Sequence, residues 1–348
     1  MSWRAAVDAC VHCGLCLPQC PTYDVLKEET DGPRGRIVLL GALLEGEAEP
    51  EEVRAPIDRC IGCLACESAC PSGVRYRDLL EEGRRRLAPP KPWIRFVLER
   101  VVPRRRLVRG LARAGRFFGR LPPDGATAPW PDPPAKPRAR VALHLGCLTD
   151  ALFPRLAREA ALVLTRLDFH VDPVEGCCGA LHRHAGLDDS KQRQGVERLR
   201  EAYDLVVSAA AGCSATDGVT DLTALLMEHA PFDGDAPAIR VAYDAPCHLL
   251  HAQGVDASRL LDSIPGVERV PLPGADKCCG AGGLYMELQR ELASQVRARK
   301  LDAIEASGAD YVATGNPGCL FWLWKGLEAR GSRVKVVHPV TLLARRFS

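Results

Sequence analysis

Two cysteine runs of identical spacing constrain this chain more than any other feature. In each run, three cysteines stand at every third position and a fourth follows directly before a proline. Three thiolates at this spacing ligate one iron–sulfur cube, and the fourth ligates the other cube of a two-cluster protein. The runs therefore predict two [4Fe–4S] clusters, because structural zinc, the alternative, favours separated Cys-x-x-Cys pairs. The first cluster is predicted to bind Cys10, Cys13, Cys16 and Cys70, and the second Cys60, Cys63, Cys66 and Cys20.

Composition narrows the class of protein. The 348 residues are 47% hydrophobic and 26% charged, as expected of a globular chain with two or three domains. No uncharged apolar stretch reaches the roughly 18 residues that would indicate a membrane-spanning helix. The first residues lack an apolar signal region. The sixteen cysteines therefore indicate metal chemistry in a reducing, cytoplasmic compartment rather than disulfides.

The second half of the chain repeats itself. Residues 140–147 match residues 240–247, and a Cys-Cys-Gly triplet at 177–179 recurs at 278–280. Short β-like runs alternate with helix-like segments in both halves, which predicts two α/β units with parallel strands. These strands are expected at 141–145, 205–209, 241–243 and 311–314.

The predicted fold class is multidomain, combining an α part with α/β units. A helical two-cluster ferredoxin-type domain is expected at 1–88, because the apolar residues at 37–44 predict a helix between the two cysteine runs. Basic amphipathic helices and a proline-rich linker follow at 89–139. The first cysteine-rich repeat is expected at 140–238 and the second at 239–348.

Each repeat carries four cysteines at matching positions. Four thiolates suffice for a further iron–sulfur cluster or for a tetrahedral zinc site. The alternative is that these cysteines are buried small apolar residues. The tentative metal ligands are Cys147, Cys177, Cys178 and Cys213 in the first repeat, and Cys247, Cys278, Cys279 and Cys319 in the second.

A strongly basic segment separates the two parts of the chain. Residues 84–120 contain thirteen Arg or Lys and one acid, a net charge of +12, and apolar residues recur there at helical spacing. Such a segment suits an anionic membrane surface or an acidic partner subunit. The alternative without a binding role is a helix that packs between domains and exposes its basic face to solvent. Nucleic acid is not expected as a partner, because no recognition motif accompanies the charge.

Several motifs together resemble the iron–sulfur subunit of bacterial glycolate oxidase. They are Cys10-Val-His-Cys-Gly-Leu-Cys16, Pro33-Arg-Gly-Arg-Ile37, Cys247-His-Leu249, Cys278-Cys-Gly280 and Ala313-Thr-Gly-Asn-Pro-Gly-Cys319. The resemblance implies ferredoxin-type clusters joined to two so-called CCG domains. It also implies an electron-transfer subunit without catalytic residues. FAD-binding oxidase subunits would convert glycolate to glyoxylate, and electrons would pass to quinone or another membrane acceptor. The chain would be cytoplasmic, or peripheral on the cytoplasmic face of the membrane.

Other members of the wider group define the alternatives. They are a CCG-domain reductase of the heterodisulfide reductase type and the iron–sulfur subunit of a D-lactate or glycerol-3-phosphate dehydrogenase. The full CCG pattern of the reductases ends in Cys-x-x-Cys, whereas Thr216 and Trp322 stand where the fifth cysteine would be. A zinc-binding module is the third alternative. No Gly-x-Gly-x-x-Gly motif is present, so the flavin is expected in another polypeptide.

Overall fold

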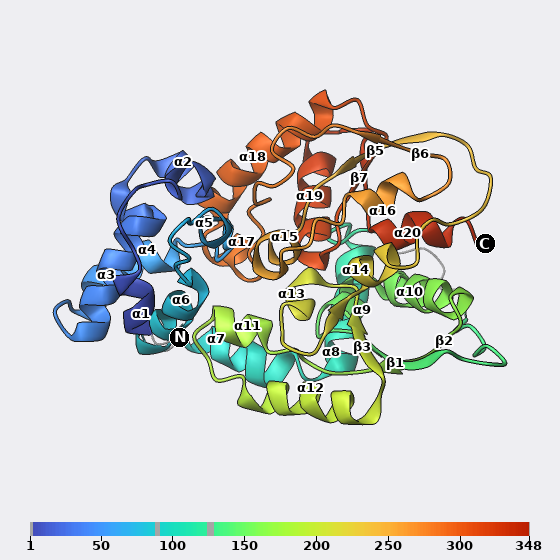
Figure 1. The fold of residues 1–348 in the computed structure, drawn as a ribbon, viewed down its shortest axis with the longest axis horizontal. Coiled ribbons are helices and arrows are strands. Elements are labelled where there is room, and N and C mark those ends of the chain that lie inside the picture. Colours follow the sequence, from blue (N-terminus) through green and yellow to red (C-terminus); the bar gives the residue numbers. More distant parts are fainter. Residues whose placement is uncertain (1–2, 88–90, 124–128, 348) are drawn as a thin grey trace.

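The computed structural model describes residues 3–87, 91–123 and 129–347. The expected domain boundary at residue 88 and the middle of the proline-rich linker lie outside these ranges. The N-terminal part is built from short helices around two cysteine loops and lies at one end of the molecule (Figure 1). Its elements are α1 (Trp3–Asp8), η1 (Leu17–Gln19), α2 (Pro21–Leu26), η2 (Glu29–Asp31), α3 (Pro33–Glu45), α4 (Pro50–Asp58), α5 (Ala65–Ser68) and α6 (Tyr76–Arg86).

Proline and glycine set the ends of these short helices. Proline occupies an N-terminal position in α2, α3 and α4, where its missing N–H group leaves no hydrogen bond unmade. A capping box joins Glu49 and Glu52 at the start of α4. Gly46 ends α3 in the left-handed conformation. The cysteine loops are therefore held between helices whose boundaries the local sequence determines.

The basic segment forms the two helices that its periodicity predicts. The first consists of α7 (Pro92–Phe96) and the continuing π-helical turn η3 (Val97–Val101), and α8 (Arg105–Phe117) follows. Pro103 lies between η3 and α8. Because proline lacks the N–H that a continuous helix would need, the two helices are separate. Figure 1 shows these helices passing from the N-terminal part to the first repeat.

Two four-stranded parallel sheets follow, and both have the same topology. The first has the order β2-β1-β3-β4 and the second β6-β5-β7-β8. This confirms the predicted fold class. The strands are β1 (Ala139–His144), β2 (Phe169–Val174), β3 (Leu205–Ser208), β4 (Thr220–Asp221), β5 (Ile239–Tyr243), β6 (Val267–Val270), β7 (Tyr311–Ala313) and β8 (Lys335–Val337).

Helices connect the strands of each sheet, as parallel pairing requires. The first repeat contains α9 (Thr149–Leu152), α10 (Pro154–Arg166), α11 (Ala180–His184), α12 (Ser190–Ala202), α13 (Ala211–Ser214) and α14 (Leu222–Met227). The second contains α15 (Cys247–Gln253), α16 (Arg259–Asp262), α17 (Tyr285–Leu288), α18 (Arg290–Ala306), α19 (Pro317–Ala329) and α20 (Pro339–Ala344).

The two repeats also share their strand register. Val141 of β1 is paired with Val171 on one side and with Leu205 on the other. Val241, one hundred positions later, is paired with Arg269 and Tyr311 in the same arrangement. The internal repeat of the sequence is therefore a repeat of pairing as well as of residue type.

The strands that the sequence does not predict are the edges of the sheets. The predicted β-like runs correspond to β1, β3, β5 and β7, which are the two inner strands of each sheet. The edge strands β2 and β6 are only partly buried and carry polar residues such as His170 and Glu268. Edge strands of this kind lack the continuous apolar run that identifies a buried parallel strand.

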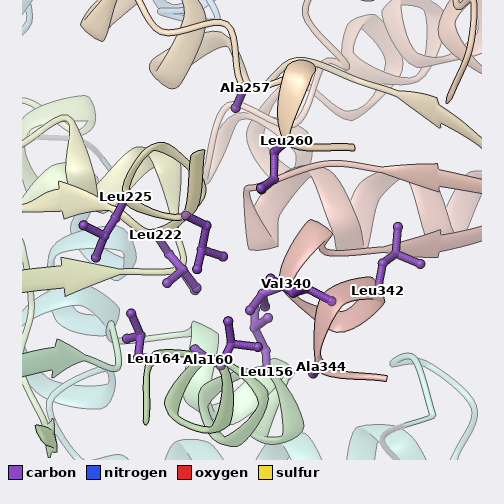
Figure 2. Close-up of a cluster of buried hydrophobic side chains, with 14 of the residues drawn as sticks. Leu156, Ala160, Leu164, Leu222, Leu225, Ala257, Leu260, Val340, Leu342 and Ala344 are labelled. Atoms are coloured by element: carbon purple, nitrogen blue, oxygen red, sulfur yellow. The ribbon is translucent and has the colours of Figure 1, made fainter. Parts of the chain in front are cut away.

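One hydrophobic core joins the two repeats. Figure 2 shows α10 and α14 of the first repeat facing α16 and α20 of the second. The contributing side chains include Leu156, Ala160, Leu164, Leu222, Leu225, Leu260, Val340 and Leu342, all of them buried. Apolar burial is the main favourable contribution to folding, so this core ties the repeats into one unit.

We predict that the two repeats unfold together. Leu222 is completely buried in the shared core, so Leu222→Ala should reduce the free energy of unfolding by about 2–5 kcal/mol. Circular dichroism in denaturant, with anaerobically prepared protein, measures this change. Leu288→Ala is the matched control, because Leu288 is 39% exposed and should change stability much less. Separate transitions for the two repeats in the Leu222 variant would contradict the prediction.

Candidate iron–sulfur centres

Cysteines from both N-terminal runs line the first recess. Cys10, Cys13 and Cys16 lie on the loop between α1 and η1, and Cys70 follows α5. Cys66 also lines this recess. Gly14 has φ +81°, and a side chain there would bring Cβ within 2.9 Å of Arg34 Nη1. Glycine adopts this left-handed conformation without strain, whereas the equivalent residue of the second run, Leu64, adopts it at φ +64°.

The second recess collects the remaining cysteines. Cys20, Cys60, Cys63 and Cys66 line it together with Arg36 and Tyr76. The structure thus brings together each of the two cysteine sets expected from the sequence, with Cys66 bordering both recesses. The assignment of each thiolate to one cluster stays a prediction. The sulfur donors in each recess fit a cubane cluster chemically.

A buried cation marks the second recess. The Arg36 guanidinium is 1% exposed, and its Nη1 donates to Thr22 Oγ1 at 3.0 Å and contacts Cys20 Sγ at 3.7 Å. Its Nη2 donates to Asp31 Oδ1 at 3.2 Å. Burial alone would raise the pKa of Cys60, but the charges of Arg36 and Arg84 outweigh it and lower that pKa. The two arginines therefore favour the anionic form of Cys60, whereas burial raises the pKa of Cys20 and of Cys66.

The first recess has its own, more exposed arginine. Arg34 Nη1 donates to the His12 carbonyl oxygen at 3.1 Å, and its Nε pairs with Glu29 at 2.5 Å. Arg34 therefore supports the first cysteine loop, whereas Arg36 contacts a cysteine of the second recess. Both arginines come from the first turn of α3, which places one cation beside each recess.

We predict that these two arginines affect different clusters. Arg36→Gln removes a positive charge that favours the reduced, more negative state, so it should lower one cluster potential by about 60–120 mV, equivalent to about 1.5–3 kcal/mol. Arg34→Gln is the matched change, and it should act on the other cluster with a smaller effect because Arg34 is more exposed. Redox titration followed by EPR measures both potentials. Equal shifts of both clusters in either variant would contradict this assignment.

The four cysteines of the first repeat converge at the carboxyl ends of its strands. Cys147 follows β1, Cys177 and Cys178 follow β2, and Cys213 lies on α13 after β3. The Cys147 thiol donates to Cys177 sulfur, which lowers the pKa of Cys177 to about 4. Cys213 donates to Cys178 in the same way, and the pKa of Cys178 is also lowered. Two thiolates are thus favoured in a four-sulfur group, as metal ligation requires.

The second repeat builds the same constellation with deeper burial. Cys279 Sγ lies 3.1 Å from Cys319 Sγ, and hydrogen bonds also join Cys278 to Cys247 and to Cys279. Hydrogen bonds from Cys278 and then Cys319 lower the pKa of Cys279 well below its usual value. Cys278, Cys279 and Cys319 are all buried. The all-sulfur sets of both repeats fit iron–sulfur or zinc chemistry.

The glycine of each Cys-Cys-Gly triplet has a packing role. Gly280 has φ +87°, and a Cβ there would lie 2.7 Å from the Ala293 carbonyl oxygen of α18. Gly179 has φ +83° and would meet the Asp189 side chain at 2.9 Å. The triplet therefore turns through a left-handed residue, which packs closely against α18 in the second repeat and against the residue before α12 in the first.

The two repeat sites face one another. Gly212 N, beside Cys213, donates to Asn316 Oδ1 at 3.2 Å, and Asn316 Nδ2 in turn contacts Cys319 Sγ at 3.5 Å. The His184 ring of the first repeat stacks on the His248 ring of the second, with centroids 5.2 Å apart. Contacts thus run directly from one cysteine loop to the other.

The N-terminal part docks on the second repeat. Tyr285 Oη donates to the Arg59 carbonyl oxygen at 3.0 Å, and Ser68 Oγ lies 2.8 Å from His251 Nδ1. Cys63 and Cys278 lie in one buried cluster at this contact, and Cys63 contributes to raising the pKa of Cys278. A sulfur ligand predicted for the second cluster therefore adjoins the second repeat site.

The sequence pattern does not predict one feature of the site, a buried ion pair. A buried ion pair joins Asp244 Oδ1 and Lys300 Nζ at 2.8 Å beside the second group of cysteines. The internal repeat is the sequence feature that draws attention to Asp244, because Asp244 occupies the position that His144 has in the first repeat. Lys300 lies within α18 and has no motif around it.

Known proteins share this combination of sites. Residues 6–74 match the model of the 4Fe-4S dicluster domain, and residues 141–216 and 241–324 match that of the CCG cysteine-rich domain. The chain is 32% identical to the glycolate oxidase iron-sulfur subunit of Escherichia coli strain K12, over 96% of this chain and 93% of that protein. The chain belongs to the glycolate oxidase iron–sulfur subunit family. Its N-terminal part is accordingly a dicluster iron–sulfur domain, and its relatives are subunits of an oxidoreductase complex.

Further relatives show the breadth of the family. The probable glycolate oxidase iron-sulfur subunit of Bacillus subtilis strain 168 is 31% identical over 96% of this chain and 92% of its own length. A fumarate reductase (CoM/CoB) subunit of Methanothermobacter marburgensis is 27% identical over 97% of this chain and 72% of its own length. Among the described residues, no helix is both long and apolar enough to cross a membrane.

Proposed function

We propose that this chain is the electron-transfer subunit of a flavin-dependent 2-hydroxy-acid oxidase, with glycolate as substrate. FAD-binding partner subunits would oxidise glycolate to glyoxylate, and this chain would pass the electrons singly toward quinone. Two [4Fe–4S] clusters would occupy the N-terminal recesses, bound as the sequence predicts. Further metal, iron–sulfur rather than zinc, would occupy the two CCG sites. The two glycolate oxidase relatives, both matched over most of their length, support the glycolate assignment.

The contact between Cys63 and Cys278 carries this proposal. Both side chains belong to one buried cluster, which joins the second N-terminal recess to the second CCG site. The stacked rings of His184 and His248 and the Asn316 bridge then lead to the first CCG site. A chain whose cysteine groups follow one another in space is suited to holding redox centres at fixed separation. In cofactor chemistry, the protein contributes this positioning.

Reductase chemistry of the heterodisulfide type is less well supported. In the first repeat Thr216 takes the place of a fifth cysteine, and its hydroxyl donates to the Cys178 carbonyl oxygen at 3.2 Å. In the second, the buried Trp322 ring takes that place and packs under the Arg297 guanidinium, 3.8 Å from its centroid. Neither residue is a thiolate, so neither repeat has the five-cysteine set.

We predict that glycolate reduces this chain only through a flavoprotein partner. EPR should show reduced clusters when glycolate is added anaerobically to the complex, but not when it is added to the isolated chain. D-lactate and glycerol 3-phosphate, supplied to the same complex, test the substrate assignment. Dye-linked glycolate oxidation by the isolated, flavin-free chain would overturn the electron-transfer role. Faster cluster reduction by one of the other two substrates would transfer the assignment to it.

We further propose that the outer face of α7 and α8 binds an anionic membrane surface. The inner face of α8 carries arginines that bind the first repeat: Arg105 donates to the Gly176 carbonyl oxygen at 2.6 Å, and Arg109 to Asp150 at 2.8 Å. Positions two residues apart lie about 200° around a helix, so Leu107 and Leu111 are on the opposite face. Both of these leucines are exposed.

The composition of that outer face favours a membrane. Phe117 is 85% and Phe118 70% exposed, and Trp93 and Phe96 of α7 are also exposed. Exposed arginines at 104, 106 and 113 lie among these apolar side chains. Aromatic and leucine side chains beside cations are typical of helices that lie in the lipid interface. The structure differs here from the simple expectation of a basic face, since Arg105 and Arg109 are engaged internally.

We predict salt-sensitive binding of the chain to vesicles that contain phosphatidylglycerol. Arg104→Gln with Arg106→Gln should weaken binding by about 1 kcal/mol per charge. Phe117→Ser with Phe118→Ser should weaken it further, through lost apolar contact. Vesicle co-sedimentation measures both effects. Arg85→Gln with Arg86→Gln is the control, because these exposed residues of α6 pair with Glu82. Binding that ignores salt and the first two variants would indicate a protein partner for this face.

A further inference from the structure

The second CCG site contains an oxygen donor among its sulfur atoms. A carboxylate oxygen of Asp244 and the sulfur atoms of Cys279 and Cys319 all lie within 4.8 Å of one another. Asp244 is 1% exposed, so its carboxylate is directed into the protein rather than toward water. It follows directly after β5, at the carboxyl end of an inner strand, where ligands of parallel sheets gather.

The cysteine set leaves a place for such a donor. The position that would hold a fifth cysteine is Trp322, which is buried and cannot ligate a metal. The first repeat has His144 where the second has Asp244. The His144 side chain is 2% exposed, both its ring nitrogens lack a hydrogen-bond partner in the described structure, and it borders a recess together with Cys177. Both repeats thus place a buried, ligand-competent side chain at the same strand end.

We propose that Asp244 is a fifth protein ligand of the metal group in the second CCG site, beside Cys247, Cys278, Cys279 and Cys319. The proposal deepens the assignment of that site and rests on the presence of iron there. A carboxylate is a harder ligand than a thiolate, so one iron of this group would have mixed oxygen and sulfur coordination. Lys300, whose ammonium also approaches the Gly274 carbonyl oxygen at 2.5 Å, would hold the carboxylate in place.

The alternative role for Asp244 is as a counter-ion for the Lys300 ammonium alone. A buried ion pair that loses one partner leaves an uncompensated charge, which destabilises a protein without any metal being involved. The variants must therefore separate loss of a ligand from loss of a charge partner. Asp244→Asn removes the anionic donor, and Asp244→Asn with Lys300→Met removes donor and ammonium together. Lys300→Met alone removes only the ammonium.

Mössbauer spectroscopy of the full chain, loaded anaerobically with 57Fe, tests the proposal. The wild-type chain should contain more iron than its two N-terminal clusters require, with one component of the higher isomer shift that oxygen coordination causes. Asp244→Asn and the double variant should both lose this component and release the additional iron to a chelator at least about tenfold faster. Lys300→Met should retain the component. Asp244→Cys should keep the iron with a spectrum typical of all-sulfur ligation.

A control variant and two contrary outcomes complete the test. Asp310→Asn changes an exposed carboxylate of the same sheet, whose Oδ2 accepts from Arg240 N at 2.9 Å, and should leave the spectrum unchanged. A wild-type spectrum in Asp244→Asn, or in the double variant, would overturn the ligand role and leave the site's iron in place. A wild-type chain with no iron beyond its N-terminal clusters would overturn both this inference and the proposed iron in the CCG repeats.

Discussion

Anionic sulfur in a buried environment is the constraint on which this structure depends. A buried charge is costly unless it is paired, hydrogen-bonded or bound to metal. Three of the four groups of cysteines accordingly have a polar partner within reach: Arg36 beside Cys20, His182 beside Cys177 and Lys300 near Cys279. The same constraint explains why α8 directs arginines inward. Arg105 binds the carbonyl oxygen that immediately precedes Cys177 and so fixes the loop.

The arrangement of the parts follows from this chemistry. Parallel strands end on one side of each sheet, and the cysteine loops leave from those ends. The repeats then meet with their cysteine loops adjacent, while their shared apolar core lies between α10, α14, α16 and α20 (Figure 2). The N-terminal helices complete the series by placing Cys63 against Cys278. The cysteine loops and the shared apolar core therefore both contribute to the contact between the repeats.

Much of the fold was predictable because its signals are local. The spacing of the cysteine runs and the repeated strand sequences depend on neighbouring residues, and they indicated the dicluster domain and the inner strands. The edge strands β2 and β6 were missed because each pairs with one strand only and is only partly buried, so neither has a continuous apolar run. The orientation of α8 was also beyond pattern reasoning, since its apolar stripe predicts a helix but not which face meets the protein. The partnership of Asp244 with Lys300 depends on residues 56 positions apart and left no local trace.

The shared core between the repeats has a consequence for the history of the chain. An ancestral unit that worked alone, or as two separate copies, would have buried its own apolar surface. Here Ala160 and Leu222 of one repeat are buried against Leu260 and Val340 of the other. Deletion of either copy would expose this surface in the survivor, and large exposed apolar patches cause association or aggregation. Once the copies had packed in this way, neither could be lost without exposing the apolar surface of the other.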